Sequence, residues 1–201
     1  MKISLQDAGK RFNREWIFRH LNYQFETTGT YAITGVNGSG KSTLLQVVAG
    51  ATMQSEGSIE YEVKGEIAED QYKYISIATP YLEVVEELTA MELLDFHKRF
   101  KSFTLAPQEM LEQVSLDLAA SKQIRYFSSG MKQRLKLAIA FFSNCPVLLL
   151  DEPTTNLDKE GIVLYHRLVK EYTKERMVIV CSNDDQEFDF CEHFISMSDY
   201  K

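Results

Sequence analysis

Apolar and polar residues alternate near the start of the chain. Ile3 and Leu5 are separated by a polar residue, and Leu21, Tyr23 and Phe25 repeat the same spacing. A period of two places the apolar side chains on one face of a β-sheet and leaves the other face to water. The first 25 residues are therefore expected to form strands of a sheet with one buried face.

Farther along, short apolar runs alternate with segments of helical period. The apolar runs predict strands at 31–34, 59–63, 74–78, 147–150, 177–181 and 194–197. The helical period predicts helices at 42–49, 131–144 and 161–172. The run at 147–150 is apolar throughout, which is typical of a strand covered on both faces. Strands that alternate with helices predict an α/β fold with a parallel sheet and right-handed crossovers.

The pattern changes between residues 88 and 118. Thr89 is placed to cap a helix, and Glu92 stands three positions later, where it would complete a capping box. Leu111, Val114 and Leu118 are spaced along one face of a second helix. We expect this middle region to be a helical insert.

Composition narrows the class of protein. A chain of 201 residues has room for one domain, with or without a small insert. The net charge of −7 argues against nucleic acid as a partner, because binding a phosphate backbone needs a basic face. No apolar run approaches the roughly 18–20 residues of a membrane helix, and the N-terminus lacks the apolar stretch of a signal peptide.

The cysteines and histidines indicate a reducing compartment and no structural metal site. The three cysteines contain no C-x-x-C pair, and Cys145 and Cys181 lie in apolar stretches where burial is expected. This usage is typical of a cytosolic protein. No two of the four histidines are spaced as ligands on one helix face.

The strongest chemical signal is the run Gly35-Val-Asn-Gly-Ser-Gly-Lys-Ser-Thr43, which fits G-x-x-x-x-G-K-[ST] between a strand and a helix. In such a P-loop the backbone amides close around phosphates, and the helix N-terminus adds positive potential. Lys41 would reach the β- and γ-phosphates, and the Ser42 hydroxyl would bind Mg²⁺. The nucleotide-binding residues expected here are Asn37, Gly38, Ser39, Gly40, Lys41, Ser42 and Thr43. The alternative is a glycine turn before an ordinary helix.

A second signal is the apolar strand that delivers Asp151 and Glu152 at its carboxyl end, the Walker B pattern. Asp151 would hold Mg²⁺ through water, and Glu152 would orient and deprotonate the attacking water. A buried strand that ends in acids is common, so this motif gains its weight from the P-loop. Together they predict a site that binds nucleotide phosphates and Mg²⁺ and directs a water at a phosphate. In the family named below, the nucleotide is ATP.

A third signal is Phe127-Ser-Ser-Gly-Met131 at the start of a helix. Here the chain resembles the nucleotide-binding subunits of ABC transporters, whose signature is L-S-G-G-Q. Ser128 and Gly130 are kept, whereas Phe127, Ser129 and Met131 depart from the pattern. The resemblance implies that Ser128, Ser129 and Gly130 close over the γ-phosphate held by the P-loop of another subunit. The alternative is an ordinary N-capped helix.

The resemblance covers nearly the whole chain. Residues 155–158 look like the D-loop, which lies across the dimer interface in the family, and residues 88–92 look like the family's L-T-x-x-E segment. Phe12 stands where the family has an aromatic residue that stacks on adenine. The alternatives for Phe12 are a place in the core of the N-terminal sheet and replacement by Trp16 as the stacking residue.

The implied fold is an ABC-type P-loop NTPase in the α/β class. It has a mostly parallel core sheet, an N-terminal antiparallel β subdomain and an inserted helical subdomain. The chain is then a single ABC ATPase domain over 1–201. Residues 1–80 and 131–201 would form the nucleotide-binding core with the β subdomain, and residues 81–130 the helical subdomain ending in the signature motif.

Two positions depart from the family. Pro80 stands where the family has the Q-loop glutamine, which touches Mg²⁺ and the attacking water, and Glu83 is one candidate stand-in. Asn183 stands where the family has its switch histidine. A carboxamide donates a hydrogen bond to the γ-phosphate but carries no positive charge and cannot act as a general acid. Misalignment of the strand end is the alternative for Asn183. Both departures predict slow hydrolysis in the absence of a partner.

The resemblance implies the ATP-binding and ATP-hydrolysing subunit of an ABC transporter. Two copies, or this chain and a related cassette, would enclose two MgATP molecules head to tail and drive a separately encoded membrane permease. The chain would then be cytoplasmic and peripheral on the cytoplasmic face of the membrane. Residues 81–94 would either line the groove that receives the permease or pack the core of the insert.

Two other functions compete with this one. The first is an ABC-type ATPase that works without a permease, for example in cofactor assembly. The second is a weakly catalytic or non-catalytic ATP-binding regulatory module, which the Pro80 and Asn183 departures motivate. Glu152 argues against the regulatory module, because a cassette that no longer hydrolyses ATP has no chemical need for that base.

Overall fold

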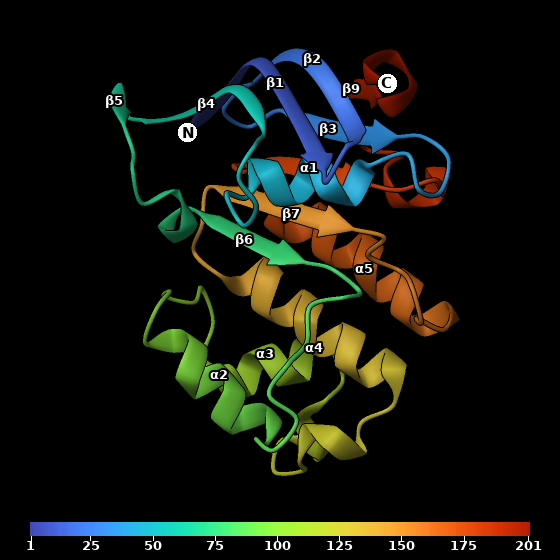
Figure 1. The fold of residues 1–201 in the computed structure, drawn as a ribbon. Helices are drawn as coiled ribbons and strands as arrows, with labels where there is room; N and C mark the ends of the chain where they lie inside the picture. Colours follow the sequence, from blue (N-terminus) through green and yellow to red (C-terminus); the bar gives the residue numbers. More distant parts are fainter.

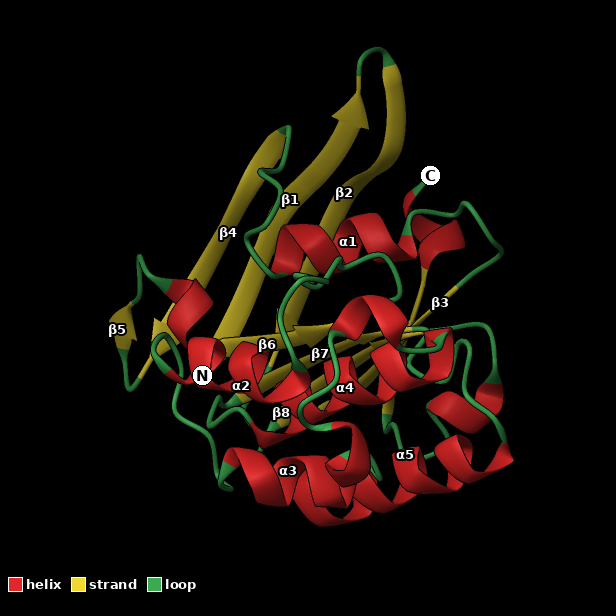
Figure 2. Ribbon diagram, turned by 90° about the horizontal axis from the view of Figure 1, so that it is seen from below, coloured by secondary structure: helices red, strands yellow, loops and turns green.

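The computed structural model describes residues 1–201. The chain folds into two β-sheets and a layer of helices. Helix α1, Lys41–Val48, lies between the two sheets, and four further helices lie on the opposite face of the larger sheet (Figures 1 and 2). These helices are α2 Ala90–Lys98, α3 Pro107–Gln113, α4 Ser129–Phe142 and α5 Lys159–Tyr172. Short 3₁₀ turns lie at 71–73, 117–119, 124–126, 185–187 and 197–200.

The smaller sheet is antiparallel and has the strand order β2-β1-β4-β5. Its strands are β1 Lys2–Phe12, β2 Glu15–Phe25, β4 Glu56–Val63 and β5 Glu66–Ile67. Ile3, Leu5, Leu21 and Phe25 are all buried. The alternating pattern of the first 25 residues therefore correctly predicts one buried face.

The larger sheet has the order β6-β7-β8-β3-β9, and every strand pair in it is parallel. Its strands are β3 Thr30–Thr34, β6 Ile75–Ala78, β7 Val147–Asp151, β8 Met177–Cys181 and β9 His193–Ser196. The carboxyl ends of β3, β6 and β7 point to the same side of the molecule (Figure 1). The expected α/β fold with a parallel core sheet and an antiparallel N-terminal sheet is confirmed.

Strand β7 separates two hydrophobic cores. Leu148 and Leu150 pack into a core of 27 buried residues shared with the helical face. Val147 and Leu149 pack into a second core of 21 buried residues, shared with α1 and the antiparallel sheet. The strand is buried along its whole length, as its continuous apolar run predicts, and each such side chain contributes roughly 1.5–3 kcal/mol.

The middle region is helical, but its second helix is shorter than its sequence pattern predicts. The Thr89 hydroxyl accepts a hydrogen bond from Glu92 N at 3.2 Å, and Glu92 Oε2 accepts one from Thr89 N at 2.8 Å, which confirms the capping box. Helix α3 ends at Gln113, because Ser115 adopts a left-handed φ of 57° that a helix cannot continue. Leu118 is 99% exposed, so its expected place on the helix face is wrong.

The remaining element boundaries differ from the sequence expectation by at most a few residues. Helix α4 ends at Phe142 rather than at residue 144, because Ser143 has an extended ψ of 130°. All three cysteines are free and buried, including Cys191, which the apolar pattern does not single out. None of the helices is long and apolar enough to span a membrane.

Candidate functional site

The turn between β3 and α1 forms the P-loop, and its shape depends on glycine. Gly40 precedes α1 with a φ of 103°, a conformation that side chains disfavour. A Cβ atom on Gly40 would lie 2.5 Å from Cγ2 of Ile17 on β2. The antiparallel sheet therefore packs directly against the loop, and only glycine fits at this contact.

A hollow of about 320 Å³ lies over this loop, and we call it the P-loop hollow. It is lined by residues 37, 38 and 40–43, together with Ile17, Tyr81 and Glu152. Lys41 is buried, and its Nζ donates to the carbonyl oxygen of Gly35 at 2.7 Å. The ammonium thus lies across the loop that would surround a phosphate.

Asp151 and Ser42 provide oxygen atoms of the kind that a hard divalent cation binds. Asp151 is buried at the end of β7, and its Oδ1 has no hydrogen-bond partner. Burial raises the pKa of Asp151, and the nearby Ser42 hydroxyl offsets part of this rise. A Mg²⁺ ion held by these two oxygen atoms would complete its shell with phosphate and water oxygens.

Glu152 differs from its neighbour in exposure and in backbone conformation. Its φ of 42° is left-handed, which costs a non-glycine residue roughly 1–3 kcal/mol. Its backbone N–H donates to the Cys181 carbonyl at 2.8 Å, which continues the β7–β8 pairing. The side chain reaches the P-loop hollow, so the structure combines a buried carboxylate at Asp151 with an accessible one at Glu152.

Asn183 follows β8 and meets the P-loop. Its Nδ2 donates to Oδ1 of Asn37 at 2.7 Å, although 146 residues separate the two along the chain. The structure therefore brings Asn183 to the same site as Lys41 and Glu152.

The segment after β6, where the family glutamine is missing, is held by a buried lysine. Lys136 Nζ on α4 donates to the Pro80 carbonyl at 2.7 Å and to the Thr79 carbonyl at 3.3 Å. Burial lowers the pKa of Lys136. Glu83 does not line the P-loop hollow and lies instead in neighbouring hollows that Lys136 also lines, so it is not the stand-in at that site.

Tyr81 is the residue of this segment that lines the P-loop hollow, and the sequence pattern does not single it out. Its position next to Pro80 is the one available signal. The sequence analysis also does not identify Lys136. Its signal is a lysine among the apolar residues of α4, which indicates a specific polar partner.

The two aromatic candidates for adenine stacking both lie outside the P-loop hollow. Phe12 ends β1 and is 48% exposed, with Lys10 Nζ 4.9 Å from its ring centre. Its alternative role as a core residue of the antiparallel sheet is therefore wrong. The Trp16 ring faces the Arg19 guanidinium at 4.2 Å.

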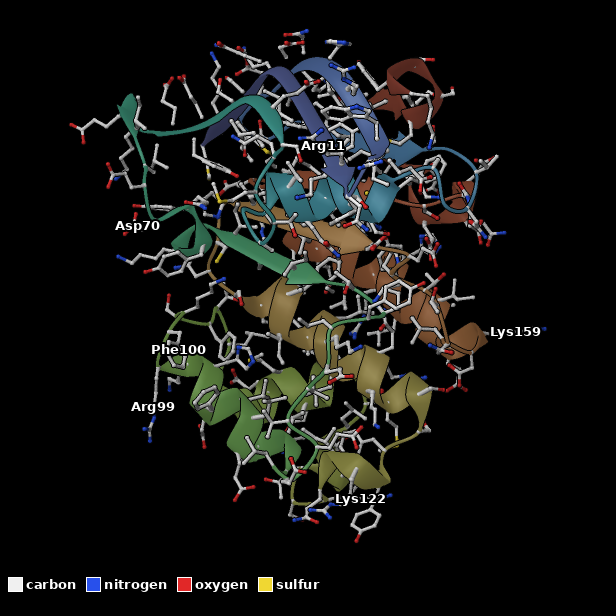
Figure 3. All side chains as sticks on the ribbon, viewed as in Figure 1. Arg11, Asp70, Arg99, Phe100, Lys122 and Lys159 are labelled. Carbon is white, nitrogen blue, oxygen red and sulfur yellow. The ribbon has the colours of Figure 1, made fainter.

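The signature segment forms a separate hollow of about 660 Å³, which we call the signature hollow. Ser128 caps α4, and its Oγ accepts from Met131 N at 3.2 Å. A Cβ on Gly130 would lie 3.0 Å from the Asn156 carbonyl oxygen, so this glycine permits the contact with residues 155–158. The signature hollow shares no residue with the P-loop hollow, and Lys122 in its wall lies at the far end of the helical part (Figure 3).

An ion pair fixes the two segments of the signature hollow to each other. Arg134 Nη2 on α4 lies 2.8 Å from Asp158 Oδ1. Asp158 also caps α5 by accepting from Gly161 N at 2.8 Å. These two contacts, the backbone one first, lower the pKa of Asp158.

Comparison with known proteins shows the family. Residues 18–155 match the family model described as ABC transporter. The chain is 28% identical over 193 residues to the uncharacterized ABC transporter ATP-binding protein YybJ of Bacillus subtilis, covering 92% of this chain and 86% of that protein. It is 29% identical over 183 residues to the lantibiotic transport ATP-binding protein SrtF of Streptococcus pyogenes, covering 90% and 79%.

Among solved structures, the fold is similar to the ATP-binding cassette MJ0796 in a dimeric post-hydrolysis state bound to ADP and Pi. The TM-score is 0.80 with 22% identity, over 96% of this chain and 93% of that one. The chain belongs to the ABC transporter family, in which it is an ATP-binding subunit and an ATPase.

Proposed function

We propose that two copies of this chain, or one copy and a related cassette, enclose two ATP molecules head to tail. The observation that carries this proposal is the separation of the P-loop hollow from the signature hollow. Both contain a helix N-terminus, yet one chain cannot close them on the same nucleotide. A second copy in the opposite orientation would set each signature hollow against a P-loop hollow.

In this proposal the phosphates lie against residues 37–43 and Phe12 stacks on the adenine. Ser128, Ser129 and Gly130 of the opposite copy face the γ-phosphate, with the Ser128 hydroxyl as a donor. Ser42 and Asp151 hold Mg²⁺, which fits the unpartnered Asp151 oxygen. When bound, the ion neutralises charge on the phosphates.

Glu152 acts as the base in hydrolysis. It accepts a proton from water as the water oxygen bonds to the γ-phosphorus and the bond from that phosphorus to the bridging oxygen breaks. ADP and inorganic phosphate are the products. Lys41 and Asn183 donate hydrogen bonds to the γ-phosphate oxygens. Because Asn183 is neutral and Pro80 has no polar side chain, hydrolysis is slow without a partner.

The partner that receives this work is a separately encoded permease, which holds the chain on the cytoplasmic face of the membrane. An apolar groove of about 620 Å³ lies between the segment after β6 and α2. Leu82, Val85, Phe96 and Phe100 line it and are exposed. Phe100 extends from the end of α2 (Figure 3). Val84 lines the groove and also packs on the helical core, and Leu88 packs on that core, so residues 81–94 serve both purposes.

The groove also supports the division of the single domain into a nucleotide-binding core and a helical subdomain. Residues 1–80 and 131–201 form the nucleotide-binding core with the β subdomain in this proposal. Residues 81–130 form the helical subdomain, which ends in the signature motif. The groove then lies where the permease contacts both parts, because α2 and the C-terminal half of α4 each contribute to its wall.

A mixing experiment tests the head-to-tail arrangement. Lys41→Ala damages the P-loop, and Ser128→Arg blocks the signature hollow. Each variant alone should lose ATP hydrolysis. In a mixed dimer one site combines both damaged surfaces, while the other combines both intact ones. Mixing should therefore restore up to about a quarter of wild-type activity, since half of the dimers are mixed and each has one intact site. No recovery on mixing would contradict the arrangement.

The location of the chain in fractionated cells distinguishes a transporter subunit from an ATPase that works without a permease. The transporter proposal expects the chain to pellet with membranes only when a permease is co-expressed. An ATPase that works without a permease would remain in the supernatant in both cases. A regulatory module would bind ATP and fail to hydrolyse it under all of these conditions.

A further inference from the structure

The Q-loop position of this chain lacks the polar side chain that the family has there. Pro80 has no side-chain donor, so the contact that the family glutamine makes must be absent or come from another group. Tyr81 is the next residue, and its side chain lines the P-loop hollow with Lys41, Ser42 and Glu152. Tyr81 is 77% exposed, so its side chain is free to meet a ligand in that hollow.

The position of Tyr81 depends on Lys136. The ammonium of Lys136 is buried on α4 and donates to the two carbonyls that directly precede Tyr81, those of Thr79 and Pro80. The side chain takes part in no ion pair within the chain. A buried ammonium costs free energy unless such acceptors are present, so this contact fixes the turn before Tyr81.

We propose, on the basis of the nucleotide site above, that the Tyr81 hydroxyl donates a hydrogen bond to the γ-phosphate of ATP in place of the missing glutamine. Lys136 is the positioning residue that holds the Tyr81 turn. A neutral phenol supplies one donor and is a poor ligand for a hard cation. Tyr81 therefore replaces the contact to phosphate and leaves the Mg²⁺ shell to Ser42 and Asp151.

Binding without turnover tests the contact directly. In the Glu152→Gln background, ATP and ADP affinities are compared for Tyr81→Phe and for the parent. Loss of a hydrogen bond to a charged group should weaken ATP binding about 10-fold or more and leave ADP binding within about twofold. Tyr126→Phe is the matched control, because that tyrosine is exposed and lines none of the hollows described above. Equal ATP affinity in Tyr81→Phe and the parent would overturn the proposal, and so would an equal loss for ADP.

A double-mutant cycle between Lys136 and Tyr81 tests whether Lys136 acts by positioning Tyr81. Lys136→Met should lower the preference for ATP over ADP about as much as Tyr81→Phe does, and the double variant should lower it no further. Lys136→Arg keeps a buried donor and should restore at least part of the preference. Additive losses in the double variant would overturn the positioning role, as would a folded Lys136→Met protein with the parental preference.

The Glu152→Gln parent separates the role of Tyr81 from the existence of the nucleotide site. If the Glu152→Gln parent binds no ATP, the nucleotide site itself is wrong. If the parent prefers ATP over ADP and Tyr81→Phe keeps that preference, then only the role of Tyr81 is wrong.

Discussion

The side-chain amide of Asn183 donates a 2.7 Å hydrogen bond to the side-chain oxygen of Asn37. This contact joins the end of β8 to the P-loop, and the Asn37 oxygen is the acceptor of the Asn183 amide. Binding of ATP would exchange one acceptor for another with more negative charge, and hydrogen bonds to charged acceptors are roughly twice as strong. We therefore expect the amide to exchange Asn37 for the γ-phosphate when ATP binds.

Asn183→Ala should lower kcat/KM for ATP about 10-fold or more, because the lost bond stabilises the γ-phosphoryl group when ATP binds and during transfer. Steady-state ATPase kinetics measure this loss and its division between kcat and KM. Asn144→Ala is a matched control at an exposed asparagine outside the P-loop hollow. An unchanged kcat/KM in Asn183→Ala would show that the amide has no catalytic role.

Gly40→Ala should damage the P-loop more than Gly38→Ala does. Both glycines have a left-handed φ, of 103° and 78°, but only a Cβ at Gly40 would meet another residue, at 2.5 Å from Ile17. We expect ATP affinity to fall about 100-fold for Gly40→Ala and much less for Gly38→Ala, because only Gly40→Ala adds a clash to the backbone strain. Isothermal calorimetry measures both. Partial recovery in Ile17→Ala/Gly40→Ala would identify the contact, and equal losses in the two single variants would contradict it.

Asp151→Asn should stabilise the nucleotide-free protein and remove its response to Mg²⁺. The buried Oδ1 of Asp151 has no partner, and replacing the carboxylate with an amide removes a buried charge. We expect the free energy of unfolding to rise by about 1 kcal/mol. Thermal unfolding with and without MgATP checks both halves. A variant that is less stable than wild type, or that MgATP stabilises as strongly, would contradict the role of Asp151.

The contacts of Asp158 make stability depend on pH. The Gly161 N–H and the Arg134 guanidinium hold the pKa of Asp158 below its usual value of 3.8. A depressed folded-state pKa stabilises the protein above the unfolded pKa, and this contribution is lost as pH falls through the folded pKa. Wild type should exceed Asp158→Asn in stability at pH 7, and the gap should close below about pH 4. Asparagine also caps helices, so the comparison isolates the charge. A gap that stays constant with pH would contradict this account.

The elements of this fold follow from local patterns in the sequence, and the details of the site do not. Period-two alternation predicts β1 and β2, and the continuous run predicts the buried strand β7. Leu118 fits a helical spacing but lies outside α3, because the left-handed Ser115 intervenes and no spacing rule contains that backbone conformation.

The polar contacts that complete the site join residues far apart in the chain. Lys136 reaches the Pro80 carbonyl across 56 residues, and Asn183 reaches Asn37 across 146. A motif identifies which side chains have the right chemistry, as it does for Lys41. It cannot identify a backbone carbonyl as an acceptor, or show that Tyr81 lines the hollow that Pro80 leaves without a donor.

The rate of ATP hydrolysis by the purified protein, measured beside Glu152→Gln, tests the central claim most directly. The account predicts slow hydrolysis by wild type, below about ten per second. It predicts a loss of about 100-fold or more in Glu152→Gln, which should still bind MgATP and elute as a dimer of the 23.1 kDa chain. Equal hydrolysis by the two proteins would show that Glu152 is not the base. ATP binding without hydrolysis in either protein would contradict its action as an ATPase on its own.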